Sequence, residues 1–536
     1  MSLRQTLNRQ RLSEDAQQLS GYGHPPSPHR QVRPEEVLRG LLISAIVMVS
    51  GIVMGYFTQS ELLRRGTAYF VLAAGAGVLL AAVAYRRIEL VMLAYIGVIW
   101  VAIGATPDLI NGVSSGTGKG IALSHIGMTF LLFIWGLRAV ALGQTSFARL
   151  PLNGLLILFL AFNVWSAVSG LLFWDPALAQ FYQGMGDPTG GRTSPVVVFF
   201  EVFVRALLVG AFWLFANNLR DEKWVRRVSW LLLLPGAAVL LVAVGHLPLK
   251  AGGYAVLQEI IVACTLFAWL LEPRAADTPP RRGLRLLAWL VLALIVFHVF
   301  RLNIRWVSGW FGLFCGLYIV AFLRSKRLFA VLLAVGLVLY VAGHAFLQQN
   351  VVHKVQTSGD MARFDMARAS VYYALRFPLG VGPGNYRAYN LYYGGLTMWK
   401  TTTFSSAHGF YSQMLSELGF GGLILTALFV LTALTMVARF YRRMPPGPSR
   451  TFVLGLAGMW GGISAASGIG DYLIPVYHNG GVYSLSTAIY AWIGLGVAVA
   501  HARLYGLVSD EKPRAIAAQI PPAAEFYPRK MGRDSV

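Results

Sequence analysis

Charged residues are scarce in this sequence, acidic residues are scarcer than basic ones, and cysteine is almost absent. Asp, Glu, Lys and Arg make up 13% of the 536 residues, against about a quarter in an ordinary soluble domain, whereas hydrophobic residues make up 56%. This composition excludes a disordered chain, a collagen-like chain and a typical soluble enzyme. The two cysteines, Cys264 and Cys315, both lie in apolar runs, so they provide neither a disulfide framework nor a metal site.

Apolar runs long enough to cross a bilayer follow one another along most of the chain. A hydrocarbon core about 30 Å thick requires about 20 apolar residues per helix, and we find about fourteen such runs. The sequence therefore predicts an all-α polytopic membrane protein. The predicted spans are 37–57, 67–85, 88–104, 120–140, 152–173, 196–216, 228–245, 254–272, 284–302, 306–323, 327–347, 408–438, 451–470 and 480–502.

The spans divide the chain into five parts. We expect a flexible cytoplasmic tail at 1–36, a bundle of about eleven helices at 37–347, a long outer loop at 348–407, about three further helices at 408–504, and a second tail at 505–536. The polar stretch before the first run does not have the pattern of a signal peptide.

Basic residues outnumber acidic ones by 45 to 23, which gives a net charge of +22. In a soluble chain this excess would indicate nucleic-acid binding. Here about 30 of the Lys and Arg residues fall in the termini and the even-numbered loops, and about 13 in the odd-numbered loops. This asymmetry predicts that both termini are cytoplasmic and that the partners are membrane lipids, not nucleic acid.

The long outer segment 348–407 departs from the charge rule, because it carries several Arg residues; it is also rich in Tyr and contains Trp399. Basic residues on the outer side predict an anionic partner. Apolar residues recur at helical intervals over 362–376, so we expect an amphipathic helix lying on the outer membrane surface.

Two pairs of charged residues lie in or beside predicted spans. Arg301 and Arg305 occupy the outer turn FRLNIRWVSGWFG, where an Arg either reaches out to water or serves a function. Glu201 and Arg205 are four residues apart within the span 196–216, and this spacing favours an ion pair within one helix.

Two local patterns towards the end of the outer segment bear on chemistry. The run LGVGPGNY contains Gly380, Gly382 and Gly384, but it lacks the flanking strand and helix of a nucleotide-binding loop, so it predicts a tight turn. His408 stands at the start of the span 408–438, where the helix dipole disfavours the imidazolium. A neutral imidazole there can accept a proton, and helix capping is the alternative role.

Three motifs follow one another in the carboxyl-terminal half. The first, IRWVSGWFGL, has an Arg at an outer edge before a Gly-bearing helix. The second, RFDMARASVYYALRFPLGVGPGNY, has an Arg before a Pro and a Gly-rich turn, and the third, AHGFYSQMLSELGFGG, has Ala-His before a Glu-x-Gly element. Together they resemble the O-antigen ligase and O-antigen polymerase superfamily of bacterial membrane glycosyltransferases, over about residues 300–435.

The resemblance implies an enzyme of the bacterial inner membrane that works on its outer face. Such an enzyme transfers a glycan from an undecaprenyl diphosphate carrier to a hydroxyl of another glycan or of lipid A-core. The transfer inverts the anomeric centre and uses no metal or other cofactor. It implies that His408 is the general base and that Arg305 and Arg363 bind the diphosphate, for which the planar Arg fork is suited. Arg301 is the alternative to Arg305, because the first motif departs from the family pattern. Glu417 either supports the start of the helix or only packs there.

Two other functions fit a chain of this kind. A polysaccharide or lipid flippase, or a secondary transporter, also has many spans, but it should show internal repeats and charged or broken helices near the midplane. A peptidoglycan polymerase of the related shape-and-division type would use an outer Asp as its base, for which Asp360 and Asp365 are candidates.

Overall fold

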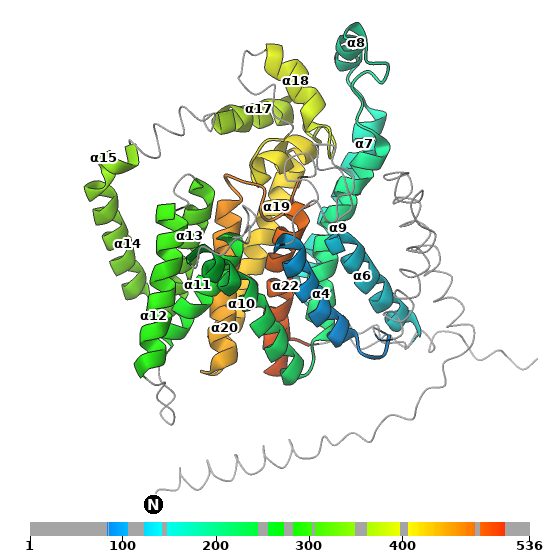
Figure 1. Cartoon of the computed structure of the whole chain (residues 1–536). Helices are drawn as coiled ribbons and strands as arrows, with labels where there is room; N and C mark the ends of the chain where they lie inside the picture. Colours follow the sequence, from blue (N-terminus) through cyan, green and yellow to red (C-terminus); the bar gives the residue numbers. More distant parts are fainter. Residues whose placement is uncertain are drawn as a thin grey trace, which may run out of the picture.

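All regular elements in the described part of the chain are helices (Figure 1). The computed structural model describes residues 83, 85–104, 123–141, 147–244, 256–272, 282–302, 306–348, 362–396, 406–476 and 483–509. The helices are α4 (Ile88–Gly104), α6 (Leu123–Ala141), α7 (Pro151–Leu172), α8 (Pro176–Gly184), α9 (Pro195–Asn218), α10 (Glu222–Val244), α11 (Val256–Leu271), α12 (Arg282–Phe297), the π-helix η1 (His298–Leu302), α13 (Val307–Arg324), α14 (Lys326–Ala342), α15 (His344–Leu347), α17 (Ala362–Arg376), α18 (Tyr386–Leu396), α19 (Phe410–Arg443), α20 (Pro448–Ala466) and α22 (Tyr483–Leu504).

The predicted spans correspond closely to these helices. Each span from 88–104 onwards coincides with a helix, whereas 37–57 and almost all of 67–85 lie outside the described residues. Among the described helices, seven are long and apolar enough to cross a membrane, namely α7, α9, α10, α12, α13, α19 and α22. The chain is therefore an all-α membrane protein, and the total of about fourteen spans stays a prediction.

Sequence signals at the helix starts explain several of these boundaries. Pro151, Pro195 and Pro448 each occupy the first turn of their helices. Proline is tolerated there because an N–H in the first turn has no acceptor within the helix. Ser325 caps α14 by accepting a hydrogen bond from the N–H of Leu328. These signals mark where the apolar runs of α7, α9, α14 and α20 become helical.

Glycine allows α13 and α20 to pack with their backbones in contact. A Cβ added at Gly462 would lie 2.5 Å from the carbonyl oxygen of Gly312, and one added at Gly316 would lie 2.9 Å from that of Gly458. Small residues of this kind let helices approach closely inside a membrane. The contact holds the helix of the first motif against the centre of the bundle.

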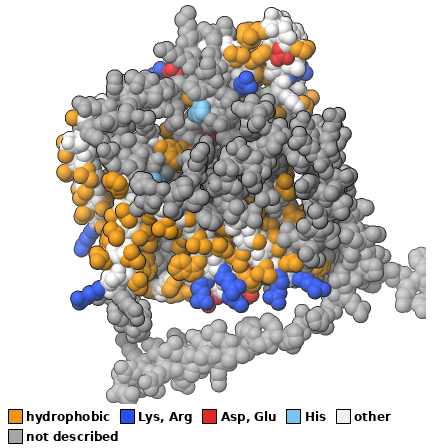
Figure 2. All heavy atoms as spheres, viewed as in Figure 1, with side chains coloured by type: hydrophobic (Ala, Val, Ile, Leu, Met, Phe, Trp, Pro, Cys, Tyr) orange, Lys and Arg blue, Asp and Glu red, His pale blue; other side chains and the backbone are white. Residues whose placement is uncertain are grey.

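One end of the bundle is lined with basic side chains. Figure 2 shows a row of Lys and Arg side chains beneath a broad band of hydrophobic ones. Arg324 donates to the carbonyl of Leu271 over 3.0 Å, and Arg450 lies 4.0 Å from Glu272. These contacts bring ends of α11, α13 and α20 together.

The opposite end carries a cap formed by α8, α17 and α18 (Figure 1). Buried aromatic side chains form its core: the rings of Trp174 and Tyr389 meet edge to face at 5.5 Å, and Arg376 lies over the ring of Tyr393 at 5.0 Å. The hydroxyl of Tyr393 donates to Asp175 at the start of α8. Burial raises the pKa of Tyr389 to about 12, so this phenol stays neutral even in moderately alkaline solution.

The cap is only partly foreseen by the sequence. The helix predicted over 362–376 is present with those bounds as α17, and its position on a membrane surface stays a prediction. The helices α8 and α18 are not among the predicted elements. α8 does carry a recognisable start, because Asp175 precedes Pro176 and its side chain accepts from the N–H of Ala177.

Candidate functional site

Helix α19 is interrupted at Gly419, within the segment that the sequence predicts as one continuous span. Gly419 has φ 67° and ψ −165°, a conformation open essentially only to glycine. A short first segment, 410–418, therefore precedes a long second segment, 420–443. A helix that ends releases its last carbonyl groups from internal hydrogen bonds, and inside a membrane protein they need other partners.

The glycine-rich turn supplies those partners. Gly380, Gly382 and Gly384 all have positive φ, which confirms the predicted tight turn. The N–H of Val381 donates to the carbonyl of Ser416, and the N–H of Gly382 to that of Glu417, each over 3.0 Å. The second motif is thus docked directly onto the interrupted helix of the third.

Substitution of Gly419 tests this docking. A Cβ added there would lie 2.0 Å from the carbonyl oxygen of Pro378. Gly419→Ala therefore introduces backbone strain and also a steric clash with the backbone of Pro378. We expect a loss of about 3 kcal/mol in the free energy of unfolding, measured by denaturation in detergent. Gly154→Ala in α7 is the control, because nothing lies within 4 Å of its added Cβ. Equal stability of the two variants would contradict the account.

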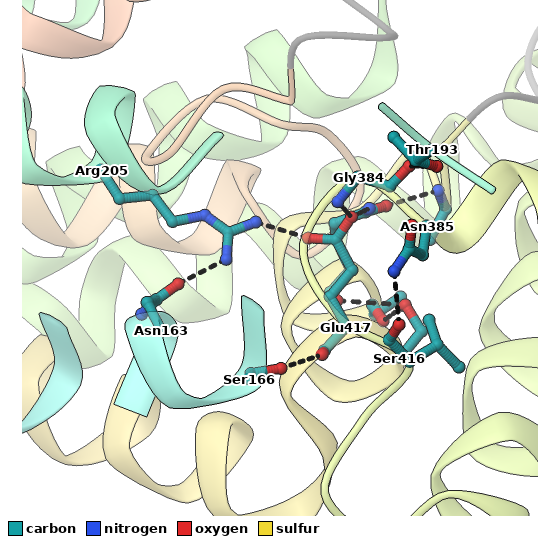
Figure 3. Close-up of polar contacts among 12 residues, drawn as sticks. Asn163, Ser166, Thr193, Arg205, Gly384, Asn385, Ser416 and Glu417 are labelled. Carbon is teal, nitrogen blue, oxygen red and sulfur yellow. Dashed lines mark hydrogen bonds and ion pairs between the residues drawn. The ribbon is translucent and has the colours of Figure 1, made fainter. Parts of the chain in front are cut away.

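The side chain of Glu417 lies at the centre of the polar contacts around the break (Figure 3). It is fully buried. One carboxylate oxygen accepts from the N–H of Gly384 over 2.8 Å and from Nε2 of Gln413 over 2.6 Å, and the other forms an ion pair with Arg205. Its backbone carbonyl also accepts from the hydroxyl of Ser166. Glu417 therefore supports the local structure, and its carboxylate is not open to a substrate.

Arg205 reaches across the bundle to Glu417 on α19 and to the side-chain oxygen of Asn163 on α7. The sequence places its partner at Glu201, in the same helix. The structure corrects this expectation, because the two terminal nitrogens of the guanidinium go to other helices. Glu201 is buried one turn away, and its Cγ would lie 3.6 Å from a Cβ added at Gly384.

His408 lies beside this cluster, just before α19 begins. Its φ is +47°, and it is the one non-glycine residue with a positive φ in the described part of the chain. The N–H of the preceding residue, Ala407, donates over 2.8 Å to Oε1 of Gln413. His408 is partly exposed, whereas Ala407 and Gln413 are buried. The imidazole thus sits on a strained backbone at the edge of a buried network.

The turn after α20 joins the third motif to the first. The N–H of Phe410 donates to the carbonyl of Ser467 over 2.9 Å. In the same turn, the hydroxyl of Tyr472 accepts from the indole of Trp306 and contacts the hydroxyl of Ser308. The start of α13 and the start of α19 therefore meet at one turn.

Of the predicted site residues, Glu417 is linked through Gln413 to the backbone N–H of Ala407, the residue before His408. Arg305 lies outside the described residues. Arg301 lies in η1 and Arg363 in the first turn of α17, and the structure describes only their backbones. Their predicted roles therefore stay predictions.

Gln413 and Asn163 are members of the network that the sequence does not single out. The i,i+4 spacing of Gln413 and Glu417 would have been a usable signal for the first. Asn163 lies in an apolar run with no motif around it.

Neither protein-family models nor curated proteins give a match to this chain.

Proposed function

We propose that the chain is a membrane glycosyltransferase of the O-antigen ligase or polymerase type. It would transfer a glycan from an undecaprenyl diphosphate carrier to a hydroxyl of a glycan or of lipid A-core. The observation that supports the proposal best is the joint between the second and third motifs. The glycine turn fills the break in α19, and Glu417 at this break is linked through Gln413 to the N–H of Ala407, next to His408 with its φ of +47°.

The proposed reaction assigns each group one task. The imidazole of His408 takes the proton of the acceptor hydroxyl, whose oxygen then attacks the anomeric carbon. The bond from that carbon to the diphosphate breaks, and the diphosphate leaves with the electron pair. Arg363 and Arg305, or Arg301 in place of Arg305, would bind the developing charge on the diphosphate oxygens.

The proposed orientation rests on charge. Cytoplasmic loops carry an excess of Lys and Arg. If the basic end of the bundle faces the cytoplasm, the cap at the opposite end faces outwards (Figures 1 and 2). A lipid-linked donor on the outer face of the inner membrane would then meet the cap.

Arg363→Ala tests the diphosphate role. We expect a loss of about 10²–10³ in transfer rate, the effect of removing one positioned donor. Arg363→Lys should recover little of it, because Lys lacks the planar fork. The measurement is glycan transfer by the purified protein, using lipid-linked glycan extracted from a deletion strain, which lacks the gene for this protein.

Arg368→Ala is the matched control, because Arg368 lies on the same helix with its side chain 74% exposed and 3.7 Å from Asp365. It should keep normal activity. Full activity of Arg363→Ala would remove this residue from the proposal.

Gels of surface polysaccharide from the deletion strain separate ligase from polymerase activity. Loss of long polysaccharide chains indicates a polymerase, and free lipid-linked polymer indicates a ligase.

The interrupted α19, with buried charges beside it, favours transport as a second candidate function. Transporters use broken helices whose free ends bind substrate or ions. Here the carbonyls of Ser416 and Glu417 accept from the glycine turn, so these ends are already occupied. Passage of lipid-linked glycan across vesicles containing purified protein would favour the transporter.

Peptidoglycan polymerisation is the third candidate function. Its candidate bases are Asp360, which lies outside the described residues, and Asp365. Asp365 lies on α17 within 3.7 Å of Arg368. Loss of transfer in Asp365→Asn, with His408→Ala still active, would favour this function.

A further inference from the structure

We infer that Gln413 is a positioning residue that holds His408 in its reactive conformation, and that Glu417 and Arg205 fix the orientation of Gln413. The inference rests on the proposed role of His408 as the base. It adds a chain of contacts that runs from α9 through α19 to the backbone next to His408.

The direction of each hydrogen bond in this chain is determined. A carboxylate only accepts, so the side-chain nitrogen of Gln413 must point towards Glu417, 2.6 Å away. The amide oxygen of Gln413 must then point the other way, where it accepts from the N–H of Ala407 over 2.8 Å. The reverse orientation of the amide would set two donors against each other at Ala407.

Arg205 fixes the carboxylate in turn. Its ion pair with one oxygen of Glu417 leaves the other oxygen directed at Gln413 and at the N–H of Gly384. Arg205 and Glu417 are fully buried, so water does not compete for these positions. Three side chains with no access to a substrate therefore determine one backbone position beside the site.

That position matters because of the φ of +47° at His408. A non-glycine residue with this backbone φ is strained, and it returns to a negative φ unless its surroundings hold it. Return to an ordinary negative φ would change this angle by about 100° and carry the imidazole away from its place. The hydrogen bond from Ala407 to Gln413 anchors the residue immediately before this angle.

The test removes the acceptor without removing bulk. We expect Gln413→Met to lower kcat about 10–100-fold, because small misplacements of a catalytic group have effects of this size. KM for the lipid-linked glycan, extracted from the deletion strain, should stay within about twofold, since Gln413 does not contact it. In Gln413→Glu the new carboxyl group and Glu417 should share one proton. The protonated side chain at position 413 then donates to Glu417 and keeps an oxygen for the Ala407 N–H, so this variant should retain more activity than Gln413→Met.

A double variant separates positioning from simple stability. In the His408→Ala background, Gln413→Met should cause no further loss of the residual rate. A purely structural residue would lower both backgrounds equally, and this result would overturn the inference. Tyr411→Phe is the control, because the Tyr411 hydroxyl, on the same helix, instead donates to Ser464 over 3.1 Å. It should leave kcat unchanged.

The outcomes distinguish this inference from the proposed function. Full transfer by His408→Ala would overturn the function and the inference together. Loss of transfer in His408→Ala, with normal kcat in Gln413→Met, would overturn the inference alone. If Gln413→Met does not fold, the folded Gln413→Glu decides: activity no better than that of His408→Ala would count against the inference.

Discussion

Arg205→Met is expected to lower the free energy of unfolding by about 3–5 kcal/mol. The substitution leaves the carboxylate of Glu417 buried with no opposite charge, and breaking a buried pair from one side has an effect of this size. Asn163 loses its charged partner as well. The measurement is denaturation of the purified protein in detergent.

Two variants control this prediction. Arg205→Met combined with Glu417→Gln removes both charges and should recover part of the lost stability. Arg220→Met, at an exposed position just after the same helix, should change the free energy of unfolding by less than about 0.5 kcal/mol. A double variant no more stable than Arg205→Met would argue against the ion pair as the cause.

His408→Ala is expected to lower transfer by about 10²–10⁴-fold, the usual contribution of a general base. The fold should be unaffected, because the His408 side chain is partly exposed and because alanine meets the same backbone strain as histidine at a φ of +47°. His408→Gly should be as inactive as His408→Ala and at least as stable as the unaltered protein, since glycine adopts this conformation freely. Transfer and unfolding are measured on the same preparations.

His344→Ala provides the comparison for an exposed histidine outside the site, and it should transfer normally. Normal polymer in a strain carrying His408→Ala would remove the imidazole from the reaction. A large loss of stability in His408→Gly would show that the side chain, and not the backbone, holds this region.

The helices of this protein follow from its apolar runs, because long hydrophobic stretches leave few alternatives in a membrane. The turn at 378–384 also follows, since three glycines in five residues favour positive φ. The interruption of α19 does not follow, because hydropathy carries no information on backbone dihedrals. SELGFGG shows glycines at the place, but glycine is common in membrane helices and marks no break by itself.

The polar network escapes prediction for a different reason. The ion pair between Arg205 and Glu417 joins residues 212 positions apart, and no local pattern links them. Spacing along one helix pointed instead to Glu201, four residues away. His408 and Glu417 were found through their motif. The link between them is local, because Gln413 lies four residues before Glu417 and accepts from the N–H of Ala407, the residue before His408.

The distance of Arg205 from its counterion along the chain has a consequence for biogenesis. Ribosomes make α9 long before α19, so the guanidinium must enter the translocon while its carboxylate does not yet exist. An arginine at the middle of an inserting helix is disfavoured by about 2.5–3.5 kcal/mol. We therefore expect α9 to stay near the translocon, or near water, until synthesis of the third motif lets it move into lipid.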